Sequence, residues 1–185
     1  ILGWIKYEKV KWLQNNNPEV PGIVYKLAQD DEKARKLDNV RKLWDAILEI
    51  RPVKNVFMDG DINRESYAVD HFIPRNFVMN DELWNLMPMD PIQNMKKNKK
   101  LPVWEDYFGQ FANNQFMMYE MIFEKPGLLK LYKQCYKDNL HSIWAIQELY
   151  RQGNSPTEFI NILEKNMQPV YDSARRQGYE IWKVS

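Results

Sequence analysis

The sequence predicts an α+β protein that is mainly α-helical, with one small irregular unit of strands and short helices between two helical parts. Two observations lead to this prediction. Apolar residues recur at three- and four-residue spacing over most of the chain, which is typical of amphipathic helices. That period fails between residues 52 and 102, where half of the ten prolines lie. We therefore expect one domain, with a helical part at 1–52, the irregular unit at 53–102 and a second helical part at 103–185.

The composition excludes several classes of protein. A chain of 185 residues with 44% hydrophobic residues is long and apolar enough to bury a core, and it is too apolar to be disordered. Its apolar runs fall far short of the roughly 20 residues that span a bilayer, so we expect no membrane association. A single cysteine rules out an internal disulfide and favours a cytoplasmic location. A net charge of +1 excludes an overall basic protein, but not a locally basic groove.

In the N-terminal part, two segments have helical character. Gly3 to Leu13 is the weaker of the two. From Asp31 to Ile50 the apolar residues, among them Trp44 and Ile47, repeat with a helical period and alternate with charged residues. This helix should end before Pro52, because the residue that precedes a proline disfavours helical backbone.

The irregular unit contains a turn and a strand. Asp59-Gly60 is a turn signal. Ser66 to Ile73 is rich in β-branched and aromatic residues, which favours a strand.

Three helices are expected in the C-terminal part. The first covers Trp104 to Phe123, and the second covers Lys130 to Arg151. Ser155 to Glu158 has the form of a capping box that opens the third helix, and Gly178 should stop it. Pro169 should kink or break this last helix.

The irregular unit also carries the residues that indicate chemistry. It contains Asp70-His71-Phe72-Ile73-Pro74, then Asn85, then Asn94 in an Asn-x-x-Lys pattern that ends at Lys97. An Asp-His pair alone is weak evidence of catalysis. The complete ordered set resembles the HNH endonucleases, also called the His-Me finger or ββα-metal family, and is similar to the HNH domain of CRISPR effectors.

This resemblance implies a fold and a set of roles. A strand should end in Asp-His, a loop should lead to a second strand that carries the middle Asn, and a helix should present the last ligand. His71 would be the general base, Asp70 and Asn94 the metal ligands, and Asn85 the residue of the catalytic set that braces the loop and orients the histidine. The chain would be a His-Asn-Asn variant without the zinc ribbon that many members carry.

The chemistry of these residue types agrees with the implied roles. Phosphodiester hydrolysis needs an activated water and charge compensation at the leaving oxygen. Histidine is the usual general base near neutral pH. One carboxylate and one amide oxygen suit Mg²⁺, or Mn²⁺ or another divalent ion, and leave positions for water and phosphate. Neighbours on a strand point to opposite faces, so Asp70 and His71 could approach the phosphate from different sides.

Basic residues near the motif are candidates for nucleic-acid contacts. Lys96 and Lys97 belong to the densest basic run in the chain, and Arg75 follows the strand. A lysine cluster is usually a solvated face, but this one adjoins the expected metal helix. We expect Lys97, Lys96 and Arg75 to contact phosphates, with Lys97 the strongest candidate because the family motif has lysine there.

The sequence thus predicts a metal-dependent HNH endonuclease that hydrolyses phosphodiester bonds, most readily those of double-stranded DNA. Two alternatives remain open. One is a nucleic-acid-binding or protein-interaction module without turnover. The other is a nuclease subunit of a defence or mobile-element system that a partner activates. The start at Ile1 leaves room for a protein partner or a further N-terminal region, and the oligomeric state and the choice between DNA and RNA stay open.

Overall fold

The computed structural model describes residues 4–5, 7–8, 11–12 and 36–184. The described residues within Gly3–Leu13 are helical, and the rest of that segment lies outside the described residues, as do residues 31–35 of the helix expected at 31–50. Residues 36–184 are mainly helical with two small sheets, which confirms the predicted fold class.

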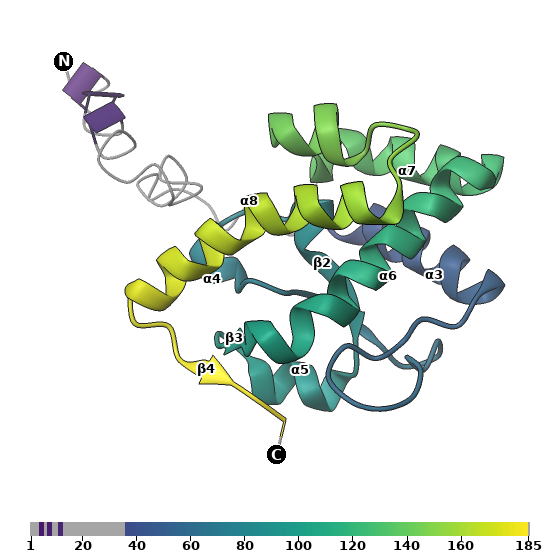
Figure 1. Ribbon diagram of the computed structural model, residues 1–185, viewed down its shortest axis with the longest axis horizontal. Coiled ribbons are helices and arrows are strands. Elements are labelled where there is room, and N and C mark those ends of the chain that lie inside the picture. The colour runs from purple at the N-terminus through teal and green to yellow at the C-terminus, as the bar shows by residue number, and fades with distance from the viewer. Residues whose placement is uncertain (1–3, 6, 9–10, 13–35, 185) are drawn as a thin grey trace.

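Residues 36–184 form helices and short strands, with a long loop between α3 and β1 (Figure 1). In order they are α3 (Asp38–Ile50), β1 (Ala68–His71), α4 (Arg75–Val78), the 3₁₀ turn η1 (Leu83–Asn85), β2 (Leu86–Met89), α5 (Pro91–Lys97), β3 (Leu101–Pro102), α6 (Trp104–Glu124), α7 (Pro126–Asn139), the π-helical turn η2 (Ala145–Leu149), α8 (Pro156–Arg176) and β4 (Ile181–Trp182).

An antiparallel hairpin lies at the centre of the irregular unit. β1 pairs with β2, and α5 follows β2 directly. The residue after β1, Phe72, is fully buried and stacks on Phe111 of α6 with ring centroids 4.6 Å apart. It also meets Trp104 and Phe108 of the same helix edge to face. Because aromatic burial contributes strongly to stability, α6 fixes the end of β1 where the motif residues lie.

The remaining helices pack around this hairpin in one continuous hydrophobic core that extends from Val40 to Trp182. α6 contacts both α7 and α8, and α3 packs on α7 (Figure 1). The C-terminal strand β4 pairs in parallel with β3, and the Leu101 amide donates to the Glu180 carbonyl at 2.8 Å. Residues at the end of the chain therefore lie beside the turn that follows α5.

The predicted helix at 104–123 is confirmed as α6, but the single helix expected at 130–151 is wrong. α7 begins earlier, at Pro126, and ends at Asn139. A break follows before the π-helical turn at Ala145–Leu149.

Polar side chains cause this break. The Asn139 amide donates to the carbonyl oxygens of Lys36 at 3.0 Å and Asp81 at 2.8 Å. The Ser142 hydroxyl donates to the Glu82 carboxylate at 2.8 Å. Side chains that bond to other parts of the chain compete with helical structure, and apolar spacing alone does not reveal them.

The last helix, α8, largely follows its prediction. Ser155 and Glu158 form the predicted capping box: the Ser155 amide donates to the Glu158 carboxylate at 2.8 Å, and the serine side chain accepts from the Glu158 amide. Gly178, with φ of 86°, follows its end. Pro169 does not break the helix. Pro169 and Lys165, whose carbonyl loses its helical partner, are both exposed to solvent.

None of the helices in the described part of the chain has the length and apolar character needed to cross a bilayer.

Candidate active site

Asp70 and His71 end strand β1 and point to opposite sides of it. The strand alternates half-buried and buried residues, so Asp70 belongs to the partly open face and His71 to the buried one. The Asp70 side chain is 15% exposed, whereas that of His71 is 1% exposed. The two candidate groups therefore approach the end of the strand from different sides, as strand geometry predicts.

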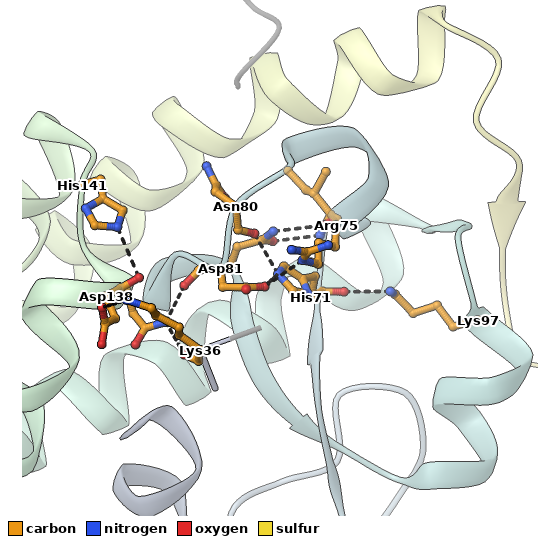
Figure 2. Close-up of polar contacts among 11 residues, drawn as sticks. Lys36, His71, Arg75, Asn80, Asp81, Lys97, Asp138 and His141 are labelled. Carbon is orange, nitrogen blue, oxygen red and sulfur yellow. Dashed lines mark hydrogen bonds and ion pairs between the residues drawn. The ribbon is translucent and has the colours of Figure 1, made fainter. Parts of the chain in front are cut away.

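The protonation pattern of the His71 ring follows from its partners. Nε2 lies 3.0 Å from the Asn80 carbonyl oxygen and 3.1 Å from the Asp81 carboxylate (Figure 2). Both partners are acceptors, so Nε2 carries the ring proton. Nδ1 is buried and has no hydrogen-bond partner in the described part of the chain. In the neutral ring Nδ1 then holds an unused lone pair, and a buried polar atom without a partner is a frequent sign of a functional role.

Asp81 is a site residue that the sequence did not indicate. Its Oδ1 accepts from Arg75 Nε at 3.1 Å and lies 3.1 Å from His71 Nε2 (Figure 2). A residue far away in the sequence holds the Asp81 backbone: the Asn139 side-chain amide donates to the Asp81 carbonyl oxygen. No spacing rule connects an aspartate in the loop to a histidine at a strand end, so only the folded chain reveals the contact.

The neighbouring Glu82 anchors the same loop. It is buried, and its carboxylate accepts from the Trp84 indole at 3.1 Å, the His141 amide at 3.1 Å and the Ser142 hydroxyl at 2.8 Å. The break between α7 and η2 therefore holds the loop that orients His71.

Asp70 and Asn94 lie on the wall of one pocket of about 440 Å³. Asp70 uses Oδ2 to accept from Lys97, and its Oδ1 makes no hydrogen bond to the described residues. The Asn94 side-chain amide, half-buried on α5, likewise has no partner among them. Two oxygen ligands with open positions fit a divalent ion such as Mg²⁺, which retains several waters. The described residues contain no cluster of three His, Cys, Asp or Glu side chains, so a thiolate or histidine-rich metal centre is not formed there.

Residues 56–103 match the sequence profile of the HNH endonuclease family. The chain contains an HNH endonuclease domain. The matched residues include β1, β2 and α5 together with all the motif positions. Comparison with curated proteins found no match, and neither did comparison with solved structures.

Within this HNH domain, Asn85 holds the backbone after β1. It was expected on the second strand, but it lies in the turn η1 just before β2. Its amide nitrogen donates to the Ile73 carbonyl at 2.9 Å, and its amide oxygen accepts from the Ile73 amide at 2.8 Å. The side chain is fully buried and does not touch the His71 ring through any hydrogen bond. It acts on the loop, so it is a positioning residue.

Lys97 lies elsewhere than expected, and its predicted phosphate contact is corrected. Its side chain is fully buried and donates to Asp70 Oδ2 at 2.8 Å and to the His71 carbonyl oxygen at 2.7 Å. An enclosed ammonium cannot reach a phosphate on the surface. The lysine instead ties α5 to the end of β1 and holds the Asp70 carboxylate in place.

The other predicted cations remain on the surface. Lys96 is exposed on α5 but does not line the pocket. Arg75 lines it, while its Nε stays bound to Asp81. Lys99, which belongs to the same basic run as Lys96, also lines the pocket.

Two further reactive groups lie away from the site. Cys135 is buried, and burial raises the pKa of its thiol to about 12, so it is no nucleophile at neutral pH. His141 donates through Nε2 to the Asp138 carbonyl oxygen at 3.2 Å on the surface (Figure 2).

Proposed function

We propose that the chain is a metal-dependent endonuclease that hydrolyses phosphodiester bonds of double-stranded DNA in the cytoplasm. His71 is the general base, and Asp70 and Asn94 hold one divalent ion. The observation that carries the proposal is the end of β1. There, a histidine with an unused Nδ1 lone pair adjoins a carboxylate that shares a pocket with Asn94. The HNH domain makes nuclease chemistry the first expectation for such a site.

In the proposed mechanism, His71 Nδ1 takes a proton from a water molecule as the water oxygen attacks phosphorus. The proton on Nε2 stays bound to the Asn80 carbonyl, and the negative charge of the nearby Asp81 carboxylate offsets the positive charge that forms on the ring. The P–O bond to the leaving oxygen breaks on the opposite side. A divalent ion held by Asp70 and Asn94 would supply positive charge beside the phosphate and the leaving oxygen.

A specific observation favours activation by substrate or by a protein partner. The His71 ring is 1% exposed and does not line the pocket that contains Asp70 and Asn94. Water and phosphate therefore reach Nδ1 only after the structure around the end of β1 shifts. Binding energy from DNA or from a partner could provide this shift, as in a nuclease subunit that stays idle until DNA is delivered.

Metal removal tests the proposed function. Purified protein should nick supercoiled plasmid DNA in Mg²⁺ or Mn²⁺ and lose this activity completely in EDTA, with recovery when the ion is added back. Asn94→Ala should raise the Mg²⁺ concentration for half-maximal cleavage by about tenfold or more. Its stability should change little, because the Asn94 side chain has no partner among the described residues.

Ile92→Ala, an exposed neighbour on α5 outside the pocket, is the matched control and should cleave like the wild type. Binding of Mn²⁺ followed by electron paramagnetic resonance gives a second readout that does not depend on turnover. Protein that binds DNA but never cuts it in Mg²⁺, Mn²⁺ or Ni²⁺ would instead be a non-catalytic binding module.

The contact between Asp81 and His71 gives a second prediction. Asp81→Asn keeps the size of the side chain but removes the charge that faces both His71 Nε2 and Arg75 Nε. We expect a fall in kcat of about 10- to 100-fold with little change in KM, because the base loses orientation while the pocket is preserved. Long-range ¹H–¹⁵N NMR of the His71 ring should show a single Nε2–H tautomer in the wild type and a mixture in the variant. An unchanged tautomer together with an unchanged kcat would exclude a positioning role for Asp81.

A further inference from the structure

The pocket of the proposed metal ligands continues into a second one. The second pocket has a volume of about 360 Å³, and both pockets share Asn76, Asn98 and Lys99 in their walls. Its far wall is the segment 177–180, which links α8 to β4. The two pockets form one groove, here called the exit groove, that runs from Asp70 to the segment after α8.

Two residues in the wall of the exit groove have unusual backbone conformations. Met79, with φ of 58°, and Asn98, with φ of 48° and ψ of −120°, are the non-glycine residues with positive φ in the described part of the chain. Such conformations are strained for residues with a Cβ atom and concentrate at functional sites. The Asn98 side chain is exposed and makes no hydrogen bond to the described residues. An asparagine that keeps a glycine-like backbone beside an open groove offers an unused amide to a ligand.

The charges of the exit groove favour an anion at one place. Arg75 is engaged with Asp81, and Lys100 pairs with Glu180 at 2.9 Å. Lys99 is exposed and has no ion-pair partner among the described residues, and it lines both pockets. A cation without an internal partner, with amides of Asn76 and Asn98 in the same wall, suits a phosphate oxygen.

We propose that the exit groove binds the phosphodiester backbone next to the scissile phosphate, with Lys99 as the charged contact and Asn98 and Asn76 as hydrogen-bond donors. This inference rests on the proposed nuclease function. When the scissile phosphate of a DNA strand lies at Asp70 and Asn94, the exit groove continues the same pocket along that strand. The charged contact to the phosphate therefore comes from Lys99, in the turn after α5, rather than from Lys96 on the outer face of the helix.

Binding measurements test the inference separately from cleavage. In a His71→Ala background, a fluorescein-labelled DNA duplex is titrated by anisotropy in EDTA at several salt concentrations. Lys99→Ala should weaken binding about fivefold and should lower the slope of log K against log salt by about 0.9, the value for one lost phosphate contact. Lys130→Ala removes the same charge from an exposed site on α7 and should bind like its parent.

Asn98→Gly gives a readout that a structural role would not produce. Glycine adopts positive φ without strain, so the melting temperature should rise by about 2 °C. DNA affinity should nevertheless fall about threefold, because the amide is lost. A variant that is more stable but binds as well as its parent would exclude a ligand contact for Asn98.

The remaining outcomes each decide the inference. Lys99→Ala with the affinity and salt slope of its parent would overturn it, as would a larger loss in Lys96→Ala, which would place the strand on the outer face of α5. Absence of any DNA binding would also overturn it. If the predicted losses appear but the wild type never cuts DNA, the exit groove stands and the proposed nuclease function fails.

Discussion

With His71 replaced by glutamine, DNA cleavage in Mg²⁺ should fall by about 100-fold or more, the range that one general base contributes. Glutamine can place an N–H near the position of Nε2 and donate to the Asn80 carbonyl beside Asp81, so the buried hydrogen bond survives. It has no basic lone pair with which to take a proton from water. His71→Ala should lose at least as much activity, with some loss of stability because it leaves a cavity in a fully buried site.

The chain offers a matched control for this prediction. His141 is the only other histidine, and its ring lies on the surface against the Asp138 carbonyl oxygen. Its bond to Glu82 comes from the backbone amide, which glutamine retains. His141→Gln should therefore cleave at the wild-type rate, measured as initial nicking of supercoiled plasmid. Wild-type cleavage by a folded His71→Gln protein would remove His71 from the mechanism.

A large effect on stability is expected at Lys97. Lys97→Met retains much of the apolar stem but removes the ammonium that bonds to Asp70 and to the His71 carbonyl oxygen. Asp70 is then left as a largely buried carboxylate without its cation. Removing one partner of a buried ion pair costs about 3–5 kcal/mol, so the free energy of unfolding should fall by about that amount in urea titrations in EDTA.

A double-mutant cycle separates the ion pair from packing. Asp70→Asn alone should also destabilise the protein, because it leaves the Lys97 charge buried. The double variant, Lys97→Met with Asp70→Asn, contains neither charge and should be more stable than Lys97→Met alone. Equal destabilisation of Lys97→Met and the double variant would mean that lost packing, and not an uncompensated charge, causes the effect.

The sequence predicts those parts of the site that local chemistry specifies. The strand composition before Pro74 locates β1, and the alternation of a strand separates Asp70 from His71. α5 begins at Pro91, and the Asp90 side chain caps it by accepting from two backbone amides. Such signals act over a few neighbouring residues, so they can be recognised in the linear chain.

Other features depend on contacts between distant residues, and the sequence did not indicate them. In the linear sequence Lys97 resembles its solvated neighbours. In the structure its side chain is buried and donates to Asp70. Asp81 becomes a partner of His71 only because Glu82 and Asn139 tie its loop to the end of α7. The break after Asn139 follows from the same bonds. Each of these outcomes depends on which polar groups meet in three dimensions, and a hydrophobic period carries no such information.

The contact of Phe72 with α6 bears on how the HNH segment could be transplanted into another protein. The segment with the HNH signature ends at residue 103, one position before Trp104, where the helix that covers Phe72 begins. A fragment cut at the limits of the signature would carry every motif residue but would expose the ring that follows Asp70 and His71. The boundary of the recognisable motif and the boundary of the folding unit therefore differ, and a fusion design must include α6.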